Sequence, residues 1–559
     1  MANKVQIFCK LAGFCVIIYR LAYFCMATNP DELERLKLKG CHFHERSRSK
    51  LTCSGLYHSM SISRLWIVLS YLSCHYTMLG FYLENGNLTN MTTNIFIHMK
   101  DLDELSIKSS GIVNIDKSSF NGLKMLRTLN LIGNEIPLVP QDLNETLPML
   151  RYLYLDNNEI TRIYKTSFQG YPADLQIISI GYNKIKVIEN GAFSSLRKLK
   201  EIQLRGNRLK RITDKTFRFQ TDLLILDISF NIGIELKSGC FSSLTELRTL
   251  NLRNCWPNGI PKDQELFLAQ GLEWTVIEKL DLGHNKIASL NDYGFRPFGA
   301  KLKLLDLEFC SLEKLEDNVF AQFVNVETLF LRNNQITIIE DNAFTGLFSL
   351  RTINLERNHL VSISENVFRV LGDNVHVALE GNPWSCSCMM ATLQSWIIAN
   401  QPNLNVTCKS PTELNGRNLK DVTHSSLYCT KPELWQCCRT PIMSTVGATV
   451  FVECAATGIP LPIVECFPRK GNPLPRNQTY EAKSYGETLA VNKIWVKDVT
   501  TRNSGMFECL ATSSQGQASK QCSIKVIETA LPVKQKGGAG CQRHTLFSFT
   551  VIVTLVFIM

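Results

Sequence analysis

One position that recurs about every 24 residues constrains the fold of this 559-residue chain more than any other feature. Asn holds it in most turns and Cys in two, and aliphatic residues stand three and five places before it, as Leu155 and Leu153 stand before Asn158. The twelve positions are Ser110, Asn134, Asn158, Asn183, Asn207, Asn231, Cys255, Asn285, Cys310, Asn334, Asn358 and Asn382. A register held over so many turns predicts a stack of equivalent units that bury their apolar faces against one another.

Each recurring residue type has a physical role in such a stack. The alternating aliphatic residues predict a short strand with one side facing inward. The Asn amide can hydrogen-bond to the backbone of adjacent turns and so satisfy polar groups that would otherwise be buried without partners. A Phe that recurs ten residues later, such as Phe168, is expected to fill the convex side. Cys255 and Cys310 stand two turns apart, about 10 Å, which is beyond disulfide reach, so we expect structural thiols there.

The pattern L-x-x-L-x-L-x-x-N/C-x-L resembles the leucine-rich repeat. The resemblance implies an α/β leucine-rich-repeat solenoid, or horseshoe, with about twelve repeats over residues 102–381. Solenoids of this kind recognise partners mainly on the concave sheet, at the outward positions between the inward leucines.

Four cysteines follow the last repeat, at positions 386, 388, 408 and 429. Their C-x-C pair and the later intervals of 20 and 21 residues resemble the cysteine-rich C-terminal cap of extracellular leucine-rich repeat proteins. The resemblance implies a cap over residues 382–430 with the disulfides Cys386–Cys408 and Cys388–Cys429. A zinc site is the competing interpretation, and the absence of C-x-x-C spacing and a glycosylation sequon at Asn405 argue against it.

Residues 431–528 form a different module. Cys454 and Cys509 lie 55 residues apart on alternating segments, and the approach to Cys509 resembles the corner before the second cysteine of an immunoglobulin domain. The resemblance implies an all-β immunoglobulin-like sandwich with a Cys454–Cys509 disulfide. Cys466 replaces the expected core Trp and Phe507 the corner Tyr, so we expect lower stability than in a complete example. A further bridge from Cys437 or Cys438 to Cys522 stays open, and Cys240 and Cys541 have no evident partner.

The two ends of the chain indicate secretion and membrane attachment. Residues 1–101 hold a leader and an uncertain N-terminal cap, and the apolar run 65–83 after Met60 resembles a signal peptide that starts there. Cys41, Cys53 and Cys74 do not form the usual cap cluster. Residues 529–545 read as a linker with an anchor site and 546–559 as an apolar tail, which favours a glycosylphosphatidylinositol anchor over a truncated spanning helix.

The residue types and their spacing place the protein outside the cell and exclude catalysis. Twenty cysteines fit an oxidising compartment. Five sequons predict glycosylation at Asn87, Asn90, Asn144, Asn405 and Asn477. The histidines lie at unrelated phases of the repeat, and no nucleophile, metal or phosphate motif accompanies them. We therefore expect no enzyme, no cofactor, no metal and no nucleic-acid partner.

Two surfaces are candidates for recognition. Outward positions on the expected concave face carry aromatic residues and Arg, the composition of protein-binding hot spots: Tyr152, Tyr154, Tyr182, Phe309, Phe330 and Arg332. A basic ridge at equal repeat offsets could bind sulfated glycan: Lys184, Lys186, Arg208 and Lys210. Scattered surface aromatics and a solvated charged face without a ligand are the respective alternatives.

The order of repeats, cap and immunoglobulin module resembles surface proteins such as neuronal adhesion molecules, Nogo-receptor-interacting proteins and neurotrophin receptor ectodomains. The resemblance implies a glycosylated, membrane-attached protein of the extracellular side that binds protein partners in cell adhesion or guidance. The alternative is an innate-immune pattern-recognition receptor that uses the same surface for microbial ligands.

Overall fold

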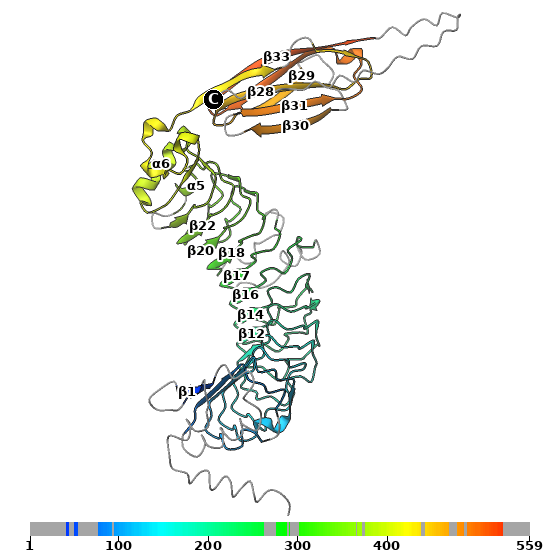
Figure 1. Cartoon of the computed structure of the whole chain (residues 1–559), viewed down its shortest axis with the longest axis vertical. Helices are drawn as coiled ribbons and strands as arrows, with labels where there is room; N and C mark the ends of the chain where they lie inside the picture. The colour runs from blue at the N-terminus through cyan, green and yellow to red at the C-terminus, as the bar shows by residue number, and fades with distance from the viewer. Residues whose placement is uncertain are drawn as a thin grey trace, which may run out of the picture. The chain divides into compact units, whose positions relative to one another are not determined.

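The computed structural model describes residues 41–43, 50–53, 77–91, 94–261, 276–287, 290, 301–364, 366–369, 371, 375–437, 442–468, 478–485 and 489–528. The chain divides into two compact units at Tyr428 and Cys429. The first unit holds the repeats and the cysteine-rich segment, and the second holds the immunoglobulin-like strands (Figure 1).

A long sheet of short strands runs through the first unit, and Figure 1 shows these strands side by side. Neighbouring strands pair in parallel from β2 onward, whereas β1 pairs antiparallel with β2. The order in the sheet is β1 (Cys41–Phe43), β2 (Lys50–Cys53), β3 (Gly80–Glu84), β5 (Glu104–Lys108), β7 (Thr128–Asn130), β8 (Tyr152–Tyr154), β10 (Ile177–Ser179), β12 (Glu201–Gln203), β14 (Ile225–Asp227), β16 (Thr249–Asn251), β17 (Lys279–Asp281), β18 (Leu304–Asp306), β20 (Thr328–Phe330), β22 (Thr352–Asn354) and β23 (His376–Ala378).

The expected roles of Asn and Phe are visible in the structure. The Asn134 Oδ1 accepts from the N–H groups of Ser110 and Ile112 at 3.0 and 3.2 Å, and its Nδ2 donates to Ile107 O at 2.8 Å. Asn158, Asn183, Asn207 and Asn334 repeat this pattern between successive turns. Phe168 and Phe193 are buried with ring centroids 5.3 Å apart, and Phe217 continues the row.

Short strand pairs form on the other side of the turns. They are β4 (Asn90–Met91) with β6 (Asn114–Ile115), β9 (Arg162–Ile163) with β11 (Val187–Ile188), β13 (Arg211–Ile212) with β15 (Glu235–Leu236), and β19 (Lys314–Leu315) with β21 (Ile338–Ile339). In the described turns, the helical pieces there are short, such as η2 (Lys117–Phe120) and α5 (Asn366–Arg369).

The sheet extends further toward the N-terminus than the sequence predicts. Strand β3 pairs with β5 so that Phe81 opposes Leu105 and Leu83 opposes Ile107, and all four side chains are fully buried. The end of the run interpreted as a signal peptide is therefore part of the solenoid, and β3 covers the apolar face that the expected start at residue 102 left open. Gly86 stands in the Asn position of this turn, and its N–H donates to the Ser110 hydroxyl at 3.1 Å.

The cysteine-rich segment closes the C-terminal end of the stack. Strand β24 (Trp384–Ser385) pairs with β25 (Cys408–Ser410), and α6 (Ala391–Asn400) lies between them in the chain. Trp384 is fully buried and its Nε1 donates to Leu379 O, while the Trp396 ring stacks on Phe368 at 4.8 Å. Around these strands lie η6 (Cys388–Met390), η7 (Thr412–Leu414), η8 (Leu419–Asp421) and η9 (His424–Ser426).

The second unit is a sandwich of two four-stranded sheets. One has the order β26 (Thr430–Cys437), β28 (Val450–Ile459), β31 (Leu489–Val496) and β30 (Gln478–Tyr485). The other has the order β27 (Ile442–Thr445), β33 (Gly516–Ile527), β32 (Gly505–Ser513) and β29 (Ile463–Pro468), and η10 (Thr501–Asn503) precedes β32. Val452, Ile494 and Phe507 lie in the core between the sheets.

Candidate recognition surfaces

The outward positions of the parallel sheet carry three of the predicted contact residues. Tyr152 and Tyr154 flank the buried Leu153 on β8, and both are half-buried on the same face. Phe330 occupies the equivalent place on β20. The Arg332 Nε lies 3.3 Å from Glu356 Oε2 on the next turn, so this guanidinium is held by an ion pair. The sheet thus presents partly exposed rings on rigid strands.

Tyr182 and Phe309 lie elsewhere than the sequence predicts. They follow the ends of β10 and β18 and sit in the turn just before the repeated Asn or Cys, with left-handed backbone at φ 49° and 55°. Both residues therefore lie at the edge of the sheet, past the end of the strand. Both remain exposed, at 49% and 43%.

A charged cluster on the concave side was not found from the sequence. The Arg253 guanidinium lies 3.0 Å from an Asp306 oxygen, 3.4 Å from Asp281 and 3.5 Å from Glu308. Burial, and then the Asp306 charge, raise the pKa of Asp281 to about 6, and burial also raises the pKa of Glu308. The sequence contains one indication of this cluster: Asp281 and Asp306 both stand four places before the repeated position, so they lie side by side on neighbouring turns.

The predicted basic ridge lies at one edge of the solenoid. The Lys210 N–H donates to the Lys186 carbonyl at 3.2 Å, so these residues are neighbours on successive turns. Lys186, Arg208 and Lys210 are exposed, while Lys184 is half-buried and paired with Glu159. Within the described parts of the chain, the three exposed cations have no carboxylate at salt-bridge distance.

Four of the five predicted glycosylation sites are accessible. Asn87, Asn90, Asn144 and Asn405 are exposed, whereas Asn477 lies outside the described residues. Exposure is the condition that a glycan requires, and occupancy stays a prediction.

In the cap, Cys386 and Cys408 form a disulfide, the pairing that the resemblance implies. Cys388 and Cys429 are each disulfide-bonded as well, and their pairing with each other stays a prediction.

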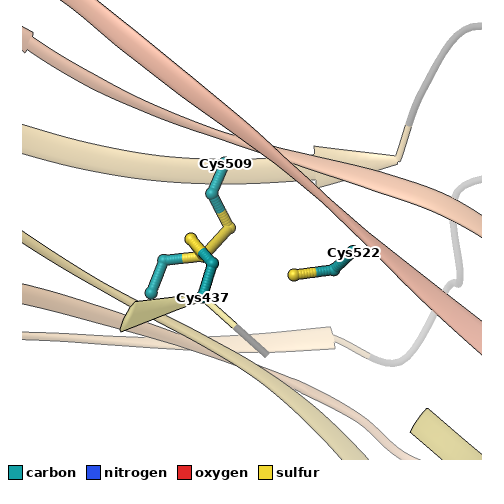
Figure 2. A group of neighbouring side chains, drawn as sticks. Cys437, Cys509 and Cys522 are labelled. Carbon is teal, nitrogen blue, oxygen red and sulfur yellow. A yellow bond between two sulfur atoms is a disulfide. The ribbon is translucent and has the colours of Figure 1, made fainter. Parts of the chain in front are cut away.

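The core of the immunoglobulin-like unit contains more cysteine sulfurs than one disulfide uses. Cys454 makes disulfide contacts with both Cys437 and Cys509, and Cys509 also contacts Cys466. Figure 2 shows Cys437, Cys509 and Cys522 pointing toward one another between the sheets. A sulfur forms one disulfide at a time, so the predicted Cys454–Cys509 bridge competes with a pair of bridges, Cys437–Cys454 and Cys466–Cys509. Cys438 and Cys541 lie outside the described residues.

The four clustered sulfurs of the second unit belong to disulfide-bonded cysteines. Cys437, Cys454, Cys509 and Cys522 have sulfurs within 4.8 Å of one another, but disulfide sulfur lacks the thiolate charge that binds a soft cation. In the solenoid, burial raises the pKa of Cys255 to about 12 and also raises the pKa of Cys240 and Cys310. These three free thiols are buried, which fits the structural role expected of Cys255 and Cys310.

Both units of the chain match known protein families. A leucine rich repeat model matches residues 81–136, 148–209, 197–255 and 300–360, and an immunoglobulin I-set domain model matches residues 436–526. The chain is a leucine-rich repeat protein with an immunoglobulin I-set domain. Neither matched family is catalytic.

The curated relatives are named for leucine-rich repeats, and two of the three below also for an immunoglobulin-like domain. Leucine-rich repeat-containing protein 24 of Homo sapiens is 27% identical over 24% of this chain and 29% of its own length. The leucine-rich repeat and immunoglobulin-like domain-containing nogo receptor-interacting protein 2 of Mus musculus is 27% identical over 27% of this chain and 25% of its own length. The leucine-rich repeat, immunoglobulin-like domain and transmembrane domain-containing protein 1 of Mus musculus is 31% identical over 27% and 24%. The matches span about a quarter of the length of these relatives.

A solved structure supports the fold alone. A chain of the TLR13-ssRNA13 complex superposes with a TM-score of 0.50 at 20% identity, covering 66% of this chain and 59% of its own.

Among the described residues, no helix has the length and apolar character required to cross a membrane.

Proposed function

We propose that this leucine-rich repeat and immunoglobulin protein acts outside the cell and binds protein partners in cell adhesion or guidance. The observation that carries the proposal is the pair of half-buried rings of Tyr152 and Tyr154, side by side on the outward face of β8. Phe330 extends this composition farther along the sheet. Aromatic side chains on rigid strands lose little conformational entropy on binding, which makes them effective anchors in protein interfaces.

The relatives support the same class of function. Their printed names describe a nogo receptor-interacting protein and a protein with a transmembrane domain, both with leucine-rich repeats and an immunoglobulin-like domain. Exposed sequons and disulfides fit the oxidising environment outside the cell. Attachment to the membrane through the C-terminal segment, by a lipid anchor, is part of the proposal, and that segment lies outside the described residues.

Two experiments test the proposal. The full chain is screened against a panel of cell-surface ectodomains and a panel of microbial glycans. Binding to an ectodomain supports adhesion or guidance, whereas binding to microbial glycans alone contradicts it and favours pattern recognition. Treatment of expressing cells with phosphatidylinositol-specific phospholipase C should release the protein, and retention after complete digestion would refute the lipid anchor.

A further inference from the structure

The position directly before the repeated Asn or Cys has left-handed backbone in every turn from Ser109 to Gly381. Most turns place small or flexible residues there, among them Gly133, Asn157, Gly206, Asn254, Asn333 and Gly381. Four turns instead carry an aromatic ring: Tyr182, Phe230, His284 and Phe309, at φ 49°, 57°, 58° and 55°. Gly and Asn adopt this conformation at little cost, whereas bulky side chains adopt it only under strain.

At the first and last of these four turns, burial of the ring does not offset the strain of the backbone. Tyr182 and Phe309 leave 49% and 43% of their surface exposed, and Phe230 and His284 are only partly buried. The repeat imposes this backbone on every turn, so each of the four rings adds a strain that Gly or Asn would avoid, and strained residues of this kind cluster at binding sites.

The rings are held in fixed positions by one another and by Arg205. The guanidinium of Arg205 lies 5.5 Å from the Tyr182 ring centroid and 4.6 Å from that of Phe230, so it sits between the two. A Cβ added to Gly206 would lie 2.6 Å from Tyr182 Cδ1, which shows that the Tyr182 ring rests directly on this glycine. The rings of His284 and Phe309 stack with centroids 4.2 Å apart. A preorganised surface of this kind loses little entropy when a partner binds.

The same edge carries positive charge at one end. Lys186, Arg208 and Lys210 are exposed two to four residues after the ring positions of their turns, and among the described residues no carboxylate neutralises them. The cations lie at the Tyr182 end of the row, whereas Asp306 and Glu308 share one guanidinium, that of Arg253, at the Phe309 end. From β10 to β18 the edge crosses five strand steps (β10, β12, β14, β16, β17, β18), about 24 Å. An extended peptide covers that length with about seven residues.

We propose that this edge row, formed by Tyr182, Arg205, Phe230, His284 and Phe309, docks an extended segment of a protein partner that has apolar side chains along its length and carboxylates in the half that meets Tyr182. The inference rests on the proposed function and names the chemistry of the partner. Apolar side chains of the segment pack on the rings, and its carboxylates meet the neighbouring cations. A sulfated glycan would satisfy the cations but not the rings.

The test replaces two of the aromatic residues by Asn, which other turns place at the same position. In the variant Y182N/F230N of the full chain, relief of backbone strain should raise the unfolding midpoint by about 2 °C. The probe is an eight-residue peptide in which Phe alternates with Glu in one half and with Ser in the other, compared with its counterpart that carries Lys in place of Glu and with heparin. The parent should prefer the Glu peptide, and the variant should bind it at least tenfold more weakly. Phe348→Asn is the matched control, because this ring is 82% exposed and lies on ordinary backbone, so it should change neither property.

Four results would overturn the inference. A variant that unfolds at a lower temperature than the parent shows that the rings serve the fold. Equal binding of the two peptides by the parent, or unchanged binding by the variant, shows that the row is not a docking site. Binding of heparin without binding of the Glu peptide assigns the edge to a glycan. A partner found in the ectodomain panel would leave the proposed function standing in each of these cases.

Discussion

Replacement of Asn285 by Ala should cost the solenoid about 4 kcal/mol of unfolding free energy. Asn285 is fully buried, and its Oδ1 accepts from the N–H groups of Cys255 and Trp256 at 2.9 and 2.7 Å. Its Nδ2 donates to Leu252 O and Leu282 O at 2.9 and 2.8 Å. Ala removes all four bonds, and among the described residues only Leu282 O keeps another donor, the Cys310 thiol at 3.3 Å. Three buried groups left without partners, at about 1–2 kcal/mol each, give the expected loss.

Asn285→Cys should lose roughly half as much as Asn285→Ala. The chain itself places Cys at this position twice, and the thiols of Cys255 and Cys310 donate to carbonyls of the preceding turn at 3.5 and 3.3 Å. The assay is urea unfolding of the full chain, with hydrogen exchange of the Cys255 and Trp256 amides as the local measurement. Asn415→Ala in the cap is the control, because this exposed side chain should change stability by less than about 0.5 kcal/mol. If Asn285→Ala lowers the unfolding free energy by less than about 1 kcal/mol and leaves amide exchange unchanged, the hydrogen bonds of the repeated Asn are not a main source of stability.

Three further predictions concern the cap, the charged cluster and the basic ridge. Cys388→Ser should cost about 2–4 kcal/mol or block secretion, and normal secretion with an unchanged melting temperature would contradict this. Arg253→Met should destabilise the protein by about 2 kcal/mol at pH 7, because three carboxylates lose their counter-charge. Asp281 has a raised pKa of about 6, so its protonation stabilises the folded state as the pH falls through 6, and the loss should shrink at pH 5; equal losses in thermal unfolding at both pH values would be inconsistent with this. Changing Lys184, Lys186, Arg208 and Lys210 to Glu should abolish retention on heparin, and equal elution of a control with Lys301, Lys409, Lys497 and Lys525 changed to Glu would show that net charge alone explains it.

The sequence predicts those parts of the fold that depend on periodicity. The strand and the buried Asn follow from the 24-residue step, because one hydrogen-bond pattern repeats from Asn134 to Asn382. The turn built on β3 was missed because Gly86 replaces the Asn that marks the other turns. The sandwich follows from alternation and the spacing of Cys454 and Cys509, but the sequence does not show that Cys437 and Cys466 reach the same sulfurs, which depends on strand register.

The candidate site was only partly predictable. Tyr152 and Tyr154 were placed correctly on one face because side chains alternate along a strand. Tyr182 and Phe309 were misplaced because the chain leaves the strand before them, and their left-handed backbone is a property of the turn that alternation does not predict. The Arg253 cluster joins side chains from three turns, so the equal repeat offsets of Asp281 and Asp306 reveal it only when the turns are stacked.

Recognition of a protein partner by the concave sheet is tested most directly by one binding measurement. The full chain and its variant Y152S/Y154S/F330T are titrated against the ectodomain identified in the panel, with Phe348→Asn as the control. Because these three rings are half-buried on the outward face, the variant should keep its fold and bind at least tenfold more weakly, a loss of about 1.4 kcal/mol or more. Unchanged affinity in a folded variant would contradict recognition by the concave sheet.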